Sequence, residues 1–303
     1  MDNNQEKSAL FLQKWWWDIT ARDQWKYINT AGVLASELRW PIYELRLGGF
    51  KLATLPVLTM YSGPIGAELM DDSDLQKCLS PLLDKFETYP SFKQFLYPHF
   101  PLVQLFRDRG YVVTRRRTYQ IDTRPPEDEI FAGIKKKRRN CVRRGLRGYT
   151  IKDNQHIDDQ IKIVFSTLKR KGVKPSYNQT LLKKLIGAAI ERDQGRIMTA
   201  ITEDGAVAAS IFLVWDETAM YYLLGGYTEL DTSSFATSSL LWNAILLAKA
   251  KGLIFDFEGS MVETIASYFR SFGAVEVPYY KVEKINSPIL RILKRIKQKY
   301  EKN

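Results

Sequence analysis

Cysteine and histidine are scarce in this chain of 303 residues, which contains two of each. Cys78 and Cys141 are too few for a disulfide scaffold, and Cys141 lies within a basic run. His99 and His156 stand alone, and no cysteine–histidine cluster has the spacing of a zinc site. Neither histidine has a G-x-S-x-G partner, which argues against a serine hydrolase of that type. The sequence therefore predicts no metal site.

Long apolar runs are also missing, because none reaches the 18 residues that indicate a membrane-spanning helix. Residues 1–8 are polar and are not followed by the apolar stretch of a secretory signal. We therefore expect a cytoplasmic protein. The composition, 45% hydrophobic and 26% charged, is typical of a soluble globular chain, and the length suggests two domains.

The positive charge, a net +11, is concentrated in a few stretches. Residues 135–147 hold eight basic residues and no acid. Such a local excess indicates an anionic partner, such as tRNA, a nucleotide-sugar or a lipid head group, although a solvated helix face would look the same. The candidate residues for binding that partner are Lys136, Arg138, Arg139, Arg143 and Arg144.

Periodicity predicts a mixed order of helices and strands along the whole chain. Pro125-Pro126 precedes a predicted helix over 127–147. The second half then contains helices over 158–171, 179–192, 237–251 and 262–272, and strands over 196–202, 207–215, 219–224, 253–258 and 275–282. We expect the third of these strands to end at Gly225-Gly226. The first half resembles a degraded version of the same plan.

Three motifs near the end of the chain carry a resemblance to a known family. They are Phe255-Asp-Phe-Glu-Gly-Ser260, Ser267-Tyr-Phe-Arg-Ser-Phe-Gly273 and Pro278-Tyr-Tyr280. Together they resemble the C-terminal signature of FemABX-like proteins, the peptidoglycan-bridge aminoacyltransferases and their acyl-CoA-using relatives. Thr118-Tyr-Gln-Ile-Asp122 and the basic helix after it resemble the entry to that family's second domain.

The resemblance implies an α/β fold of two tandem GNAT-like domains with mixed sheets flanked by helices. Residues 1–120 would form a degraded N-terminal domain, residues 121–285 the domain with the donor site, and residues 286–303 a basic amphipathic helix. The activity implied is acyl or aminoacyl transfer to an amine of a cell-envelope precursor or saccharide. The donor would be acyl-CoA or aminoacyl-tRNA, with no tightly bound cofactor.

Two alternatives stay open. The first is an acyl-CoA-dependent acyltransferase acting on a sugar or small amine. The second is a basic nucleic-acid-binding protein that keeps the scaffold without catalysis. The family's usual pyrophosphate loop is not evident at residues 227–236, which leaves the identity of the donor open.

Acyl transfer to an amine needs a proton acceptor and donors to the developing oxyanion. Alternation in Phe255–Glu258 predicts that Asp256 and Glu258 share one face of a strand, where either could accept the amine's proton. The same carboxylates could instead pair with arginines or cap a helix. By resemblance Arg270, which stands where relatives have lysine, would stabilise the oxyanion or the leaving group. A surface arginine is the alternative.

The serine-rich start of the helix near residue 237 offers free backbone N–H groups for a donor's phosphates. The predicted donor-binding residues are Tyr227, Ser233, Ser234, Ser238 and Ser239. Ordinary helix capping is the alternative for the serines, and a core position is the alternative for the tyrosine.

The C-terminal stretch from Pro288 places Ile289, Ile292, Leu293 and Ile296 at helical spacing among basic residues. A basic amphipathic helix can lie on an anionic membrane surface, which would place the protein at the inner face of the membrane. The alternative is that this helix packs on its own protein.

Overall fold

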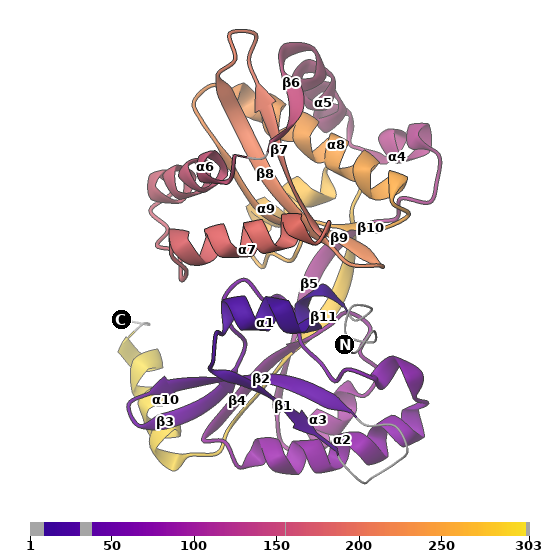
Figure 1. The fold of residues 1–303 in the computed structure, drawn as a ribbon. Coiled ribbons are helices and arrows are strands. Elements are labelled where there is room, and N and C mark those ends of the chain that lie inside the picture. Colours follow the sequence, from indigo (N-terminus) through magenta and orange to yellow (C-terminus); the bar gives the residue numbers. More distant parts are fainter. Residues whose placement is uncertain (1–8, 31–37, 155, 301–303) are drawn as a thin grey trace. The chain divides into compact units, whose positions relative to one another are not determined.

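The computed structural model describes residues 9–30, 38–154 and 156–300, and the chain folds into two compact units (Figure 1). Unit 1 comprises Met1–Arg116 and Pro278–Asn303, and unit 2 comprises Arg117–Val277. The chain passes from one unit to the other within strand β5 (Val112–Ile121) and returns within β11 (Val275–Ile285). No helix in the described ranges is both long enough and apolar enough to cross a membrane.

Unit 1 contains a sheet in the order β1-β2-β3-β4-β11. Its elements in the described residues are η1 (Leu10–Leu12), α1 (Lys14–Thr20), β1 (Trp25–Asn29), β2 (Arg39–Leu47), β3 (Phe50–Thr54), η2 (Ala67–Leu69), α2 (Asp72–Glu87), β4 (Ser91–Leu96), α3 (Val103–Asp108) and α10 (Pro288–Tyr300). The core is aromatic, with Trp40, Phe86 and Phe92 fully buried and in mutual ring contact. The helix α2 includes Pro81 within its length.

Unit 2 contains a sheet in the order β5-β10-β9-β8-β7-β6. Its further elements are α4 (Glu127–Gly133), α5 (Lys136–Gly148), β6 (Thr150–Asn154), α6 (Ile157–Arg170), α7 (Gln179–Glu191), β7 (Gly195–Ile201), β8 (Val207–Trp215), β9 (Ala219–Tyr227), η3 (Thr232–Ser234), α8 (Phe235–Ala250), β10 (Ile254–Asp256) and α9 (Glu263–Arg270). Helices α5 and α8 cover one face of the sheet and α6 and α7 the other (Figure 1). The predicted α/β class, a mixed sheet flanked by helices, is confirmed.

The strands β9 and β10 run parallel but stay paired only briefly. Their register joins Ala219–Tyr221 to Ile254–Asp256, where β10 ends, whereas β9 continues to Tyr227. On its other side β9 shifts register against β8 at Phe212/Leu213, as a β-bulge does. Beyond Tyr221 the strand β9 therefore has no pairing with β10.

The prediction that β9 ends at Gly225-Gly226 is wrong, since the strand includes both glycines. A Cβ on Gly226 would stand 2.8 Å from the backbone of Ile163 in α6. A Cβ on Gly225 would stand 2.0 Å from the Tyr222 hydroxyl. These glycines therefore serve close approach within a strand rather than a turn.

The single helix predicted over 127–147 is two helices, α4 and α5. Ile134 between them has an extended backbone and a fully buried side chain, and the N–H of Lys135 donates to the Ser271 carbonyl at 2.9 Å. Burial of Ile134 and this tertiary hydrogen bond interrupt a helix that the local sequence would otherwise continue.

Candidate functional site

A cavity of about 520 Å³ lies in unit 2 where β9, the start of α8 and α9 meet. Three of the predicted donor-binding residues line it, namely Tyr227, Ser233 and Ser234. Two other lining tyrosines, Tyr222 and Tyr268, are not among the predicted donor-binding residues. Their aromatic character is typical of any buried strand or helix, so no local signal distinguishes them from core residues.

The cavity depends on the two glycines of β9. Gly225 lets the Tyr222 ring lie over the strand, and Gly226 lets α6 approach the opposite face. Both glycines line the cavity themselves. A larger residue at either position would displace the Tyr222 hydroxyl or the α6 backbone. The shape of the cavity therefore requires both glycines.

The start of α8 is closed by a carboxylate of the chain itself. Asp231 accepts hydrogen bonds from the N–H of Ala236 at 2.8 Å, from the N–H of Thr237 at 3.3 Å and from the Thr237 hydroxyl. Burial raises the pKa of Asp231, although these bonds oppose the shift. A helix N-terminus attracts anions, and here a side-chain anion already occupies that position.

Ser238 and Ser239 lie one turn further along α8 and are buried away from the cavity lining. Ser239 donates to the Ala236 carbonyl at 2.9 Å and packs against Gly145 of α5, where a Cβ would stand 2.8 Å from the serine. Ser238 accepts a hydrogen bond from Arg138 at 2.8 Å. These two serines thus join α8 to α5.

Arg138 also holds one wall of the cavity. Its guanidinium lies 4.2 Å from the centre of the Tyr268 ring and donates to the Ser271 hydroxyl at 3.0 Å. Contact with the ring face is an attractive cation–π geometry. Because Tyr268 lines the cavity, this predicted anion-binding arginine acts from within the protein as a support for that wall.

The predicted catalytic residue Asp256 is fully buried at the end of β10. One carboxylate oxygen accepts from the Thr118 hydroxyl and from the N–H of Glu258 at 2.7 Å, and the other accepts from Gln120 at 2.8 Å. Burial raises the pKa of Asp256 to about 6 even though all three hydrogen bonds favour its charged form. This carboxylate therefore has little remaining capacity to receive a proton from a ligand.

Glu258 is placed differently from its neighbour two residues earlier. Its backbone is left-handed at φ 58°, which bends the chain out of the strand direction. One carboxylate oxygen, Oε1, is buried without a hydrogen-bond partner. Burial, and then the negative charge of Asp256, raise the pKa of Glu258 well above its usual range.

The prediction that Asp256 and Glu258 share one strand face is wrong, because β10 ends at Asp256. Burial raises the pKa of the Tyr222 and Tyr177 hydroxyls, and the nearby charge of Glu258 adds to both shifts. Since Tyr222 lines the cavity, Glu258 and its unpartnered Oε1 stand beside the cavity wall.

Arg270 lies at the end of α9 and is not among the residues that line the cavity. Its guanidinium forms an ion pair with Glu263 and donates to the Tyr119 hydroxyl at 3.2 Å. Arg117 contacts the same glutamate at 3.1 Å. Arg270 therefore belongs to a charged network on α9 that is distinct from the cavity lining.

The remaining predicted anion-binding residues belong to α5. Arg139 donates to the carbonyls of Ala132 and Ile134, so it closes the break before α5. Arg143 and Arg144 are exposed, at 5.2 and 5.4 Å from the rings of Phe131 and Phe235, and Lys136 is exposed. We call Lys136, Arg143 and Arg144 the α5 patch.

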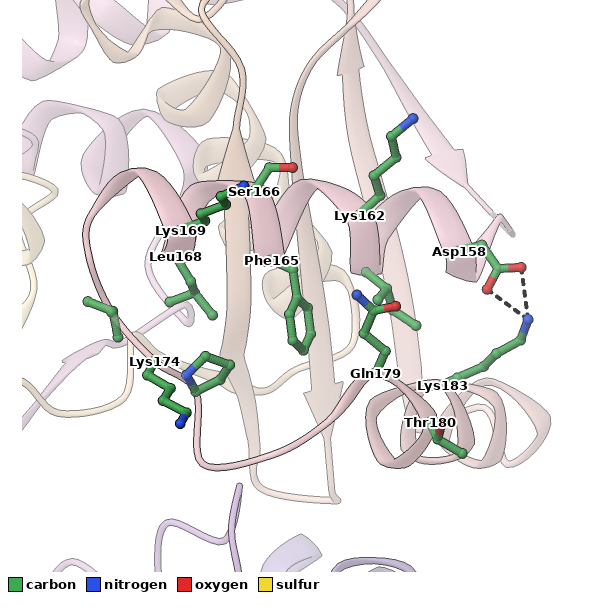
Figure 2. Close-up of a pocket in the computed structure, with 13 residues that line it drawn as sticks. Asp158, Lys162, Phe165, Ser166, Leu168, Lys169, Lys174, Gln179, Thr180 and Lys183 are labelled. Carbon is green, nitrogen blue, oxygen red and sulfur yellow. Dashed lines mark hydrogen bonds and ion pairs between the residues drawn. The ribbon is translucent and has the colours of Figure 1, made fainter.

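A larger cavity, about 880 Å³, lies between α6, α7 and the segment that connects them. Figure 2 shows Phe165 and Leu168 pointing from α6 toward that segment. The carboxylate in its lining, Asp158, is paired with Lys183 at 2.7 Å. No predicted site residue lines this cavity, and it offers no unpaired carboxylate, so the smaller cavity remains the candidate for chemistry.

Comparisons with known proteins identify a matching domain in part of the chain. Residues 130–263 match a family model described as an acetyltransferase (GNAT) domain. This match includes β9, α8 and Glu258, and it ends at the start of α9. A comparison with curated proteins finds no match.

Several solved structures share the fold at low sequence identity. A crystal structure of FemX is 12% identical, with 95% of this chain and 96% of that chain covered and a TM-score of 0.74. The C-terminal domain of a putative lysylphosphatidylglycerol synthetase from Agrobacterium fabrum is 11% identical, with 93% and 88% covered and a TM-score of 0.59. L-PGS from Bacillus licheniformis is 14% identical, with 89% and 88% covered and a TM-score of 0.55. With its matched domain and this shared fold, the chain is an acyltransferase that has a GNAT domain and a FemX-like fold.

Proposed function

We propose that the protein transfers an aminoacyl group from a charged tRNA to an amine of a cell-envelope precursor or a related saccharide. The observation that carries this proposal is Glu258, a buried carboxylate with an unpartnered oxygen beside the cavity wall. Burying such a group costs free energy unless it is used, so an unsatisfied carboxylate at this point supports a catalytic role.

In the proposed reaction the amine nitrogen of the acceptor attacks the ester carbonyl of the aminoacyl group. A new C–N bond forms, and the ester C–O bond to the ribose of the tRNA breaks. Glu258 accepts the proton that the amine loses, and a proton returns to the departing ribose oxygen. A raised pKa suits Glu258 for this step, since it makes the carboxylate a stronger base.

Asp256 is proposed as a positioning residue rather than the base. Its hydrogen bond to the N–H of Glu258, at 2.7 Å, fixes the bend that aims the glutamate. For the oxyanion we propose the Tyr268 hydroxyl, because burial raises its pKa to about 12 and keeps it protonated as a donor. Arg270, already paired with Glu263, would then order α9 instead of touching the substrate.

The choice of an aminoacyl donor rests on Asp231. A diphosphate of CoA at the start of α8 would meet a carboxylate that already accepts those N–H groups. The ammonium group of an aminoacyl ester would instead be attracted to the same carboxylate. The tRNA phosphates would be bound by the α5 patch, whose cations are exposed on the helix surface.

Filter binding with radiolabelled ligands tests the donor. Total tRNA charged with a mixture of ¹⁴C-labelled amino acids should bind saturably, whereas CoA and acetyl-CoA should show no one-site binding by calorimetry. One-site CoA binding would support the acyl-CoA-dependent alternative on a sugar or small amine. Equal affinity for charged and uncharged tRNA, unchanged in Tyr268→Ala, would support the non-catalytic nucleic-acid-binding alternative. Failure of every donor to bind would overturn the proposal.

A further inference from the structure

The C-terminal helix α10, drawn in yellow in Figure 1, belongs to unit 1. It carries an apolar stripe that is exposed among the described residues. Ile289, Ile292, Leu293 and Ile296 are 58%, 57%, 53% and 47% exposed. Their spacing of three, four and seven residues places all four on one side of the helix. Burial of isoleucine and leucine is the main source of helix docking energy, so the described part of the protein leaves this stripe without a partner.

Polar contacts attach the first half of the helix to its own unit. The Arg291 Nε donates to the Ile285 carbonyl at 2.6 Å. The Lys294 ammonium contacts Glu283 at 3.0 Å. These contacts involve the basic side of α10 and the end of β11, and the apolar stripe takes no part in them. The alternative that the stripe packs on its own protein therefore finds no support among the described residues.

The charges on α10 restrict what can cover the stripe. Residues 288–300 contain five basic residues and no acid. Two copies of this helix packed stripe to stripe would bring ten positive charges together, which disfavours a second copy as the occupant. An apolar stripe bordered by Lys and Arg matches an anionic bilayer, which accepts apolar side chains at its acyl boundary and cations at its head groups.

We propose that α10 docks the protein on an anionic membrane surface, lying flat with Ile289, Ile292, Leu293 and Ile296 inserted below the head groups. At 13 residues the helix is about 20 Å long, too short to span the acyl core but sufficient to lie along it. The proposal does not rest on the transfer activity, because neither the cavity nor Glu258 belongs to α10.

Vesicle sedimentation of the full-length protein tests this proposal. Partition into vesicles of phosphatidylglycerol and phosphatidylcholine should exceed partition into pure phosphatidylcholine on the order of a hundredfold at low salt. The Ile292→Asp variant should lose roughly tenfold or more of this partition. The matched control is Leu69→Asp, at a leucine of unit 1 that is 76% exposed and lies outside α10, and it should partition like the parent protein.

Three results would overturn the proposal. The first is equal partition into anionic and neutral vesicles, or none into either. The second is an equal loss in both variants. The third is a dimer in light scattering that Ile292→Asp dissociates while vesicles leave the parent protein unbound, which would assign the stripe to a second copy. Donor binding is measured separately, so a failure here and a failure of the transfer proposal remain distinguishable.

Discussion

Replacing Glu258 with glutamine should raise stability at alkaline pH while removing catalysis. The folded-state pKa of Glu258 lies well above that of an unfolded glutamate, because burial and the charge of Asp256 oppose ionisation. The folded protein therefore binds an additional proton, and the free energy of unfolding falls as the pH rises through the folded-state pKa. Glutamine has no charge to bury, so the Glu258→Gln variant escapes this loss.

The size of the effect follows from the same linkage. Each unit by which the pKa is raised corresponds to about 1.4 kcal/mol at high pH. For a folded unit of about 160 residues, a stability difference of that size changes the Tm by roughly 3–6 °C. Thermal scans of both proteins should therefore nearly coincide at pH 4, and the variant should melt progressively higher toward pH 9.

The catalytic half of the prediction uses single-turnover transfer from ¹⁴C-aminoacyl-tRNA to a UDP-linked muramoyl peptide that carries a lysine amine. Loss of a general base typically costs 10²–10⁴-fold in rate, so we expect Glu258→Gln to fall within that range. The control is Glu203→Gln, a change at an exposed glutamate in the turn between β7 and β8. A variant that transfers within threefold of the parent, or whose Tm advantage does not widen with pH, would refute the assignment of Glu258.

Three further predictions concern the surroundings of the cavity. Gly226→Ala should lower the free energy of unfolding by roughly 1–3 kcal/mol, because the added Cβ would crowd the backbone of Ile163. The control Gly148→Ala has open space around it and should leave the Tm in thermal denaturation unchanged. Arg270→Ala removes a partly exposed ion pair with Glu263 and should keep transfer within about tenfold of the parent, since the tyrosine hydroxyl is the proposed oxyanion donor; complete loss of transfer would restore the oxyanion role to the arginine. The three cations of the α5 patch predict that tRNA affinity falls roughly 40-fold between 50 and 200 mM salt, and alanine substitution of all three should flatten that dependence in filter binding.

Hydrophobic patterning predicted most elements of unit 2, because most of them pack apolar side chains against its core. The strand predicted over 207–215 coincides with β8, and Phe255 and Phe257 are buried as their alternation indicated. Strand β6 was not predicted, since its five residues hold a single aliphatic side chain, Ile151. Periodicity thus locates elements that pack many apolar side chains on the core and misses a short edge strand that contributes one such residue, Ile151.

Two of the errors near the site share a physical cause, which is tertiary contact overriding a local signal. Gly225-Gly226 has the sequence of a turn, but α6 and a tyrosine hydroxyl require glycine inside a strand. The break at Ile134 depends on a core position and on a hydrogen bond to Ser271. The left-handed backbone of Glu258 ends an alternation that would otherwise continue. Ile163 and Ser271 are distant in sequence from the residues they contact, so no local pattern could have revealed these contacts. The bend at Glu258 is instead held by the local hydrogen bond from its N–H to Asp256.

The position of Asp231 bears on which acyl donor the protein uses, although the fold alone does not determine that donor. The start of α8 was predicted to hold a phosphate, because its serines leave backbone N–H groups free. In the structure the side chain four residues before α8 fills that place with a carboxylate. The phosphates of a donor must then be bound by cations at another place on the protein. The exposed cations of unit 2 are most concentrated on α5. A chain that closes the helix terminus and keeps a basic helix is better suited to a long polyanion bound along its surface than to a single diphosphate. The salt dependence of binding therefore distinguishes a tRNA donor from a CoA donor as directly as a transfer assay does.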